Sequence, residues 1–132
     1  MSVPNLEVVQ RAVDAWNRRD VDAWLDLLDP EIEVVFPPEV PEPGPFRGHE
    51  EIQGWMQGFL SAWDEHRAEI DELISSDADR IVLTVHLVGR GAGSGAELDE
   101  TDAHVFTFRN GKILSWRNYV TREQALEAIG AE

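Results

Sequence analysis

Apolar residues recur at helical spacing near the start of the chain. They predict an amphipathic helix over residues 5–18. The members of its apolar stripe are Leu6, Val9, Val13 and Trp16. Asp20 is placed to cap a second, short helix that carries Trp24. We expect this second helix to stop at Asp29-Pro30, because a residue before proline avoids helical backbone angles.

A short strand and a proline-rich loop come next in the pattern. Residues 32–36 are rich enough in apolar and branched side chains for a strand. Residues 37–45 contain five prolines, which excludes both a helix and a central strand. We expect a stiff loop there, either a rim over a cavity or a plain connector.

The third predicted helix begins at Gly48, with acidic residues in its first turn, where the helix dipole favours them. Its apolar stripe consists of Ile52, Trp55, Met56, Phe59, Leu60 and Trp63. The pattern after Trp63 fits either a continuing helix or a new strand over residues 67–75. We favour the strand, because the polar run at 75–79 is typical of a turn.

The rest of the chain has the pattern of β-structure. Strands are predicted over residues 81–88, 97–108 and 112–121, followed by a terminal helix over 122–129. Asn110-Gly111 between the last two strands is a strong signal for a tight hairpin turn. This order of elements predicts one domain over residues 1–132, of the α+β class, with helices packed on one face of a curved antiparallel sheet.

Strand alternation predicts which polar side chains share a face. If the connection between the two middle strands is centred near Ser94, Thr84 lies opposite His104 and His86 lies opposite Asp102. All four then share one face with apolar residues, as in a ligand pocket with a few polar groups. Across the last turn this face also receives Leu114, Trp116, Asn118 and Val120. The other face is apolar enough to need a cover, which a second subunit would supply.

Composition and charge exclude several classes of function. The net charge of −15 disfavours nucleic acids and anionic membranes as partners. The absence of cysteine excludes disulfides, thiolate metal sites and cysteine nucleophiles. No histidine or carboxylate spacing indicates a metal site, and nothing indicates a cofactor. No apolar run approaches the roughly 18 residues of a membrane helix, and the first residues do not resemble a secretory signal, so a cytoplasmic location is expected.

Several segments together resemble the SnoaL-like branch of the nuclear transport factor two-like superfamily, which also includes the ketosteroid isomerases. They are Trp16-Asn-Arg-Arg-Asp20, the strand and proline loop, Phe46-Arg-Gly-His-Glu-Glu-Ile52, and the hairpin Phe108-Arg-Asn-Gly-Lys-Ile113. The resemblance implies a cone-shaped, cystatin-like barrel, in which a strongly curved sheet wraps around helices and encloses a deep pocket. It also implies a homodimer through the outer sheet face and a strand after Trp63.

The resemblance constrains the chemistry as well. The catalytic Tyr, Asp and Asp of the steroid isomerases correspond here to Ala12, Phe36 and His104, which excludes that mechanism. Polyketide cyclases of this family use a His and an Asp on the last hairpin. Here His104 takes the first position and Asn118 the second. Because an amide is no base at neutral pH, cyclase chemistry would need its base elsewhere.

The candidate site follows from these positions. His104, with Asp102 and His86 nearby, is the predicted acid–base group. The predicted contacts to a small hydrophobic molecule are Trp16, Phe36, Trp55, Phe59, Trp63, Phe106, Trp116 and Asn118. We expect His49 to belong to a helix start and His66 to a solvated turn. Three functions stay open: an enzyme of cyclase, isomerase or dehydratase type, a non-catalytic binder of an apolar ligand, and a dimeric interaction module.

Overall fold

Four helices and six strands make up the described part of the chain, which in this computed structural model comprises residues 4–37, 44–77, 79–93 and 95–130. In chain order they are α1 (Pro4–Asn17), α2 (Val21–Asp26), β1 (Leu28–Val35), β2 (Phe46–Arg47), α3 (Gly48–Ala62), β3 (Trp63–Ser76), β4 (Arg80–Gly91), β5 (Glu97–Arg109), β6 (Lys112–Tyr119) and α4 (Arg122–Ala128). Within these ranges, no helix is long and apolar enough to cross a membrane.

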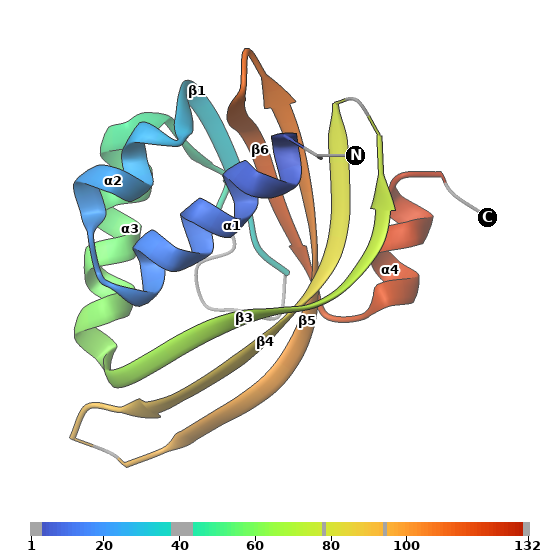
Figure 1. The fold of residues 1–132 in the computed structure, drawn as a ribbon. Helices are drawn as coiled ribbons and strands as arrows, with labels where there is room; N and C mark the ends of the chain where they lie inside the picture. Colours follow the sequence, from blue (N-terminus) through green and yellow to red (C-terminus); the bar gives the residue numbers. More distant parts are fainter. Residues whose placement is uncertain (1–3, 38–43, 78, 94, 131–132) are drawn as a thin grey trace.

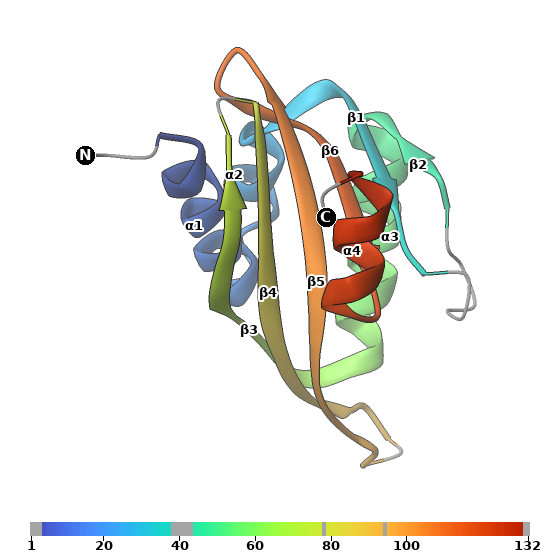
Figure 2. The same cartoon turned by 90° about the vertical axis from the view of Figure 1, so that its right-hand side faces the viewer.

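The strands form one sheet in the order β2-β1-β6-β5-β4-β3. Neighbours are antiparallel except β1 and β6, which run parallel. The sheet curves around α1, α2 and α3, and α4 lies on its opposite side (Figure 1). Figure 2 shows α4 in front of the sheet, beside β5 and β6. The α+β prediction is therefore confirmed, with a curved sheet whose two edge strands, β2 and β3, do not meet.

The helices begin close to where the sequence places them. The Asp20 carboxylate accepts a hydrogen bond from the Ala23 amide at 3.1 Å, which confirms the predicted cap of α2. The prediction that Asp29-Pro30 ends this helix is wrong, because α2 stops at Asp26 and both residues lie inside β1. Asp29 is buried, and Arg109 at the end of β5 donates to it at 2.7 Å. Residues 38–43 of the proline-rich segment lie outside the described residues.

The strand predicted after α3 is confirmed and is longer than expected. β3 starts directly at Trp63 and pairs with β4 along its whole length. Gly89 follows the predicted strand 81–88, but in the structure it lies within β4 and pairs with His66 of β3. A Cβ at position 89 would come within 2.6 Å of the Glu65 carbonyl oxygen, so only glycine allows this close approach of the two strands.

The predicted pairing of β4 with β5 is wrong by one residue. Leu83 lies opposite His104, Val85 opposite Asp102, and His86 opposite Thr101. Because side chains alternate along a strand, this shift exchanges the two faces of β4. Thr84 and His86 therefore belong to the outer face rather than the concave face. Ser94, the expected centre of the connection, lies outside the described residues.

Two apolar clusters hold the layers together. The larger lies between α1, α2, α3 and the concave face of the sheet. The smaller lies on the outer face, where Val82, Ala103 and Val105 pack against Ala125 of α4, which is completely buried. The chain's own last helix thus covers part of the face for which a second subunit was expected. Dimerisation through this face stays a prediction.

Candidate functional site

A cavity of about 680 Å³ lies between α1, α2, α3 and the concave face of the sheet. This volume falls in the range of pockets that bury a drug-sized molecule. All eight residues predicted to contact a ligand line it: Trp16, Phe36, Trp55, Phe59, Trp63, Phe106, Trp116 and Asn118. His104 and Asp102 line it as well, whereas His86 does not. Their roles in binding or catalysis stay predictions.

Aromatic rings form a continuous row along the cavity. Trp55 of α3 is its centre and stacks on Phe36 at 4.6 Å and on Phe59 at 5.3 Å between ring centroids. Trp116 of β6 meets Trp55 edge-on at 6.1 Å and stacks on Phe106 of β5 at 6.0 Å. Such offset and edge-to-face contacts keep large rings in fixed positions. The walls are thus largely apolar and built from aromatic rings in mutual contact.

His104 stands at the β5–β6 side of this cavity and is almost fully buried. The Trp116 indole Nε1–H donates to its Nδ1 at 3.1 Å. Because an indole is only a donor, Nδ1 must be an acceptor, and a neutral ring then carries its proton on Nε2. Burial lowers the pKa of His104 to about 3. At neutral pH this side chain is therefore a neutral hydrogen-bond donor and a poor base.

The Nε2 atom of His104 is buried and has no hydrogen-bond partner among the described residues. Asn118 lies directly opposite on β6, is also buried, and its Nδ2 likewise lacks a partner within the described ranges. Directly opposed side chains on antiparallel strands have their Cβ atoms roughly 5 Å apart. The two residues therefore place unpaired N–H donors next to one another at the cavity wall.

A pair of carboxyl groups follows on the same strand face. Glu100 and Asp102 are two residues apart on β5 and both line the cavity. Burial raises the pKa of Asp102 to about 7, and the neighbouring charge and hydrogen bond of Glu100 raise it further in the same direction. Asp102 therefore exchanges its proton near neutral pH, which is the property of a general acid or base. The sequence singled out Asp102 but not Glu100.

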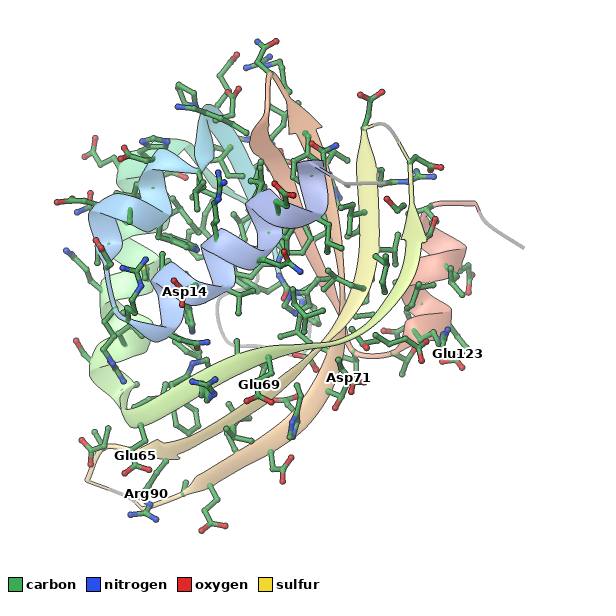
Figure 3. The ribbon with its side chains drawn as sticks, in the orientation of Figure 1. Asp14, Glu65, Glu69, Asp71, Arg90 and Glu123 are labelled. Atoms are coloured by element: carbon green, nitrogen blue, oxygen red, sulfur yellow. The ribbon has the colours of Figure 1, made fainter. Side chains whose placement is uncertain are left out.

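His86 was predicted to act with His104, and this prediction is wrong because the register shift turns it to the outer face. Its Nε2 lies 2.7 Å from the Asp99 carboxylate. The hydrogen bond to Asp99 raises the pKa of His86, and the negative charges of Glu69 and Asp71 add to this shift. Figure 3 shows Glu69 and Asp71 following one another along β3. His86 thus belongs to an acidic outer surface.

His66 was expected in a solvated turn, and it instead lines the cavity. The Trp16 indole Nε1–H donates to its Nδ1 at 2.9 Å, and its Nε2 has no partner within the described part of the chain. Burial lowers the pKa of His66 to about 4, with a smaller contribution from the charge of Arg19. The available signal was alternation: in a strand that starts at Trp63, His66 shares a face with Ala68 and Ile70.

A family model of the SnoaL-like domain matches residues 9–116, which is most of the chain. The chain belongs to this family. This family assignment agrees with the observed curved sheet and the three helices that surround the cavity. In this SnoaL-like protein, Ala12 and Phe36, which the resemblance matches to two catalytic positions of the steroid isomerases, both line the cavity. Neither side chain can exchange a proton.

Known relatives of this SnoaL-like protein cover nearly its whole length. An uncharacterised PhzA/B-like protein of Pseudomonas aeruginosa is 27% identical over 127 residues, which is 94% of this chain and 89% of the relative. An NTF2-like protein of unknown function from Burkholderia pseudomallei is 25% identical, with a TM-score of 0.80 over 99% of this chain and 100% of that one. TerC, co-crystallised with polyporic acid, is 21% identical, with a TM-score of 0.78 over 97% and 99% of the two chains.

No group of three or more His, Asp or Glu side chains with the arrangement of a metal site occurs among the residues that the structure describes. The chemistry that the described residues bring to the cavity is that of their polar groups. It consists of imidazole and amide donors at His104 and Asn118, a carboxyl pair at Glu100 and Asp102, and a further imidazole donor at His66.

Proposed function

We propose that this SnoaL-like protein binds a small, largely apolar molecule through a hydrogen-bond acceptor such as a carbonyl oxygen. The observation that carries the proposal is the pair of buried, unpaired donors, His104 Nε2 and Asn118 Nδ2, at the wall of an aromatic cavity. One acceptor atom between them completes both hydrogen bonds. The aromatic row contacts the rest of the molecule.

The energetics of buried polar groups support this assignment. A buried donor without a partner costs about 1–3 kcal/mol, because it has lost its hydrogen bonds to water. Two such donors on opposed strand positions are an expensive arrangement for a residue pair that only fills a core. A hydrogen-bond acceptor on the ligand offsets this cost, and burial of the ligand's apolar body adds to the binding affinity.

The charge of the site favours an uncharged ligand. Both imidazoles are neutral at pH 7, because burial lowers their pKa values to about 3 and about 4. The carboxyl groups of Glu100 and Asp102 line the same cavity, and the whole chain carries a net charge of −15. An anionic ligand would be repelled, and no cationic side chain lines the cavity within the described ranges to attract one.

Tryptophan fluorescence during titration with polycyclic ketones and with the matching hydrocarbons tests the proposal. We expect His104→Leu and Asn118→Leu each to weaken ketone binding about tenfold, which corresponds to one lost hydrogen bond. Hydrocarbon binding should change little. His86→Gln is the matched control, because it removes a histidine from the outer face. If His104→Leu and His86→Gln affect ketone binding equally, the proposal is wrong.

Acid–base catalysis is a second candidate function, and the position of Asp102 favours it. In the ionised state its carboxylate would take a proton from the carbon next to the bound carbonyl. The C–H electron pair would form the enolate, whose negative oxygen His104 and Asn118 would stabilise as donors. This is chemistry of the isomerase, cyclase or dehydratase type, with His104 as a donor rather than the base. Exchange of the ligand's α-protons for deuterium should stop in Asp102→Asn while binding persists. Binding without exchange in the unmodified protein would leave the non-catalytic function.

A further inference from the structure

The cavity contains the same two-residue arrangement twice. Trp116 donates from Nε1 to Nδ1 of His104 at 3.1 Å, and Trp16 donates from Nε1 to Nδ1 of His66 at 2.9 Å. In both pairs the indole fixes the ring and leaves the proton on Nε2. In both pairs that Nε2 atom is buried and lacks a partner among the residues described. Only one of the two histidines is used by the proposed function.

The two pairs stand at opposite ends of the aromatic row. His66 contacts Phe59 at 4.9 Å between ring centroids, and Phe59 stacks on Trp55 at 5.3 Å. Trp55 meets Trp116 at 6.1 Å, and Trp116 contacts His104 at 5.7 Å. The two imidazoles thus lie at the ends of a path of three rings, all of which line the cavity. Their pairing partners on β4, Gly89 and Leu83, are six residues apart along the strand, so one small acceptor group cannot satisfy both imidazoles.

The close approach of β3 to β4 at Gly89 places His66 in the cavity. His66 is the pairing partner of Gly89, and a Cβ there would lie 3.4 Å from His66 Cδ2 and 3.3 Å from Trp63 Cε3. The missing side chain therefore lets β3 and its rings approach β4 closely. Figure 3 shows this bend near Glu65 and Arg90, where β3 leaves the end of α3. The second donor is held by the fold rather than exposed on a loop.

We infer that the ligand of this cavity is an elongated, rigid and uncharged molecule with a hydrogen-bond acceptor at each end. His104 binds one acceptor, and His66, through its Nε2–H, binds the other. The inference rests on the proposed function and adds the class of ligand, a polycyclic compound with two terminal acceptors. His66 is then the residue that selects such a molecule over one with a single acceptor.

A matched series of rigid probes tests this inference. Androstanedione carries one carbonyl on each terminal ring, its two monoketones carry one each, and androstane carries none. We expect the diketone to bind about tenfold tighter than either monoketone, because it makes one more hydrogen bond. His66→Phe keeps an aromatic ring and should reduce the diketone to the affinity of a monoketone. His104→Leu identifies the monoketone that binds to His104, and His66→Phe should leave the affinity of that monoketone unchanged.

The outcomes separate the inference from the proposed function. If His104→Leu weakens ketone binding but His66→Phe weakens the hydrocarbon and the diketone equally, the site at His104 stands and His66 is only a packing residue. If none of the four probes binds, or if His104→Leu has no effect on any ketone, the proposed function fails and this inference fails with it. A second readout needs no substitution. In protein labelled with ¹⁵N-histidine, the diketone should shift the Nε2–H signals of both His66 and His104, and a monoketone only one of them.

Discussion

The neutral, buried state of His104 makes a prediction about stability against pH. Burial lowers the pKa of His104 to about 3 in the folded protein, whereas an unfolded histidine titrates near 6.5. Above pH 6.5 neither state binds the proton, and the contribution is zero. Between pH 6.5 and 3 only the unfolded chain binds it, so stability falls as the solution becomes more acidic. Between pH 7 and pH 5 this one residue should cost about 2 kcal/mol of unfolding free energy.

The substitution His104→Leu removes this titration and keeps an apolar side chain at the cavity wall. It also leaves the Trp116 indole without its acceptor, which changes stability by the same amount at every pH and therefore cancels in the comparison. Urea unfolding followed by tryptophan fluorescence at pH 7 and at pH 5 gives the loss of unfolding free energy for each of the two proteins. We expect unmodified protein to lose about 2 kcal/mol more than His104→Leu over this interval.

His86 provides a control of opposite sign. Its hydrogen bond to Asp99 raises the pKa of His86 above the unfolded value, so its stabilising contribution is present at acidic pH and is lost as the pH rises. His86→Gln should therefore increase the loss of stability between pH 7 and pH 5, whereas His104→Leu should decrease it. Equal losses in unmodified protein and His104→Leu would show that His104 is not a buried neutral group. The donor role proposed for it would then be refuted as well.

Two further predictions concern the elements that shape the cavity and its cover. Gly89→Ala should lower the unfolding free energy by about 2 kcal/mol, because the new Cβ meets the Glu65 carbonyl oxygen at 2.6 Å. Gly54→Ala, on α3, places its Cβ in open space and should raise the unfolding free energy by roughly 1 kcal/mol. Urea unfolding measures both changes. Thr121→Ala removes the capping box of α4 and should cost about 1 kcal/mol. Amide hydrogen exchange should then accelerate in α4 and much less in α1, and equal acceleration in both helices would contradict a local effect of the cap.

Signals that act over a few residues made most of the fold predictable. The Asn110-Gly111 turn marked the last hairpin correctly, and Arg109 pairs with Lys112 across it. The apolar stripe of α3 and the cap at Asp20 depend only on helical spacing and on one hydrogen bond. The bulge beyond the hairpin turn places Trp116 and Asn118 on the face of Phe106 and His104, which is the face predicted for them. Leu114, predicted for the same face, is the exception, because this bulge interrupts the pairing between Thr107 and Phe108.

Features of the fold that depend on how distant segments pair could not be predicted from such local signals. The register of β4 with β5 depends on the geometry of a glycine-rich connection, and an offset of one residue moves every β4 side chain to the other face. That offset put His86 at the wrong place. The start of β3 depends on where α3 ends, and Trp63 belongs to a helical stripe as well as to the strand. His66 was missed because the sequence pattern does not mark this junction.

These two corrections change the chemistry that the cavity supports. With His86 on the outer face, no second histidine stands beside His104 from β4, and the polar neighbours of His104 are the Trp116 indole and Asn118 across the strand pair. The indole occupies the one nitrogen that could accept a proton. The neutral imidazole is therefore a hydrogen-bond donor rather than the base suggested by the family pattern, and in the proposed catalytic function Asp102 exchanges the proton. With His66 inside, the same Trp–His arrangement occurs at both ends of an aromatic row. Under the proposed function, a cavity built in this way recognises its ligand by where the acceptors lie along a rigid body.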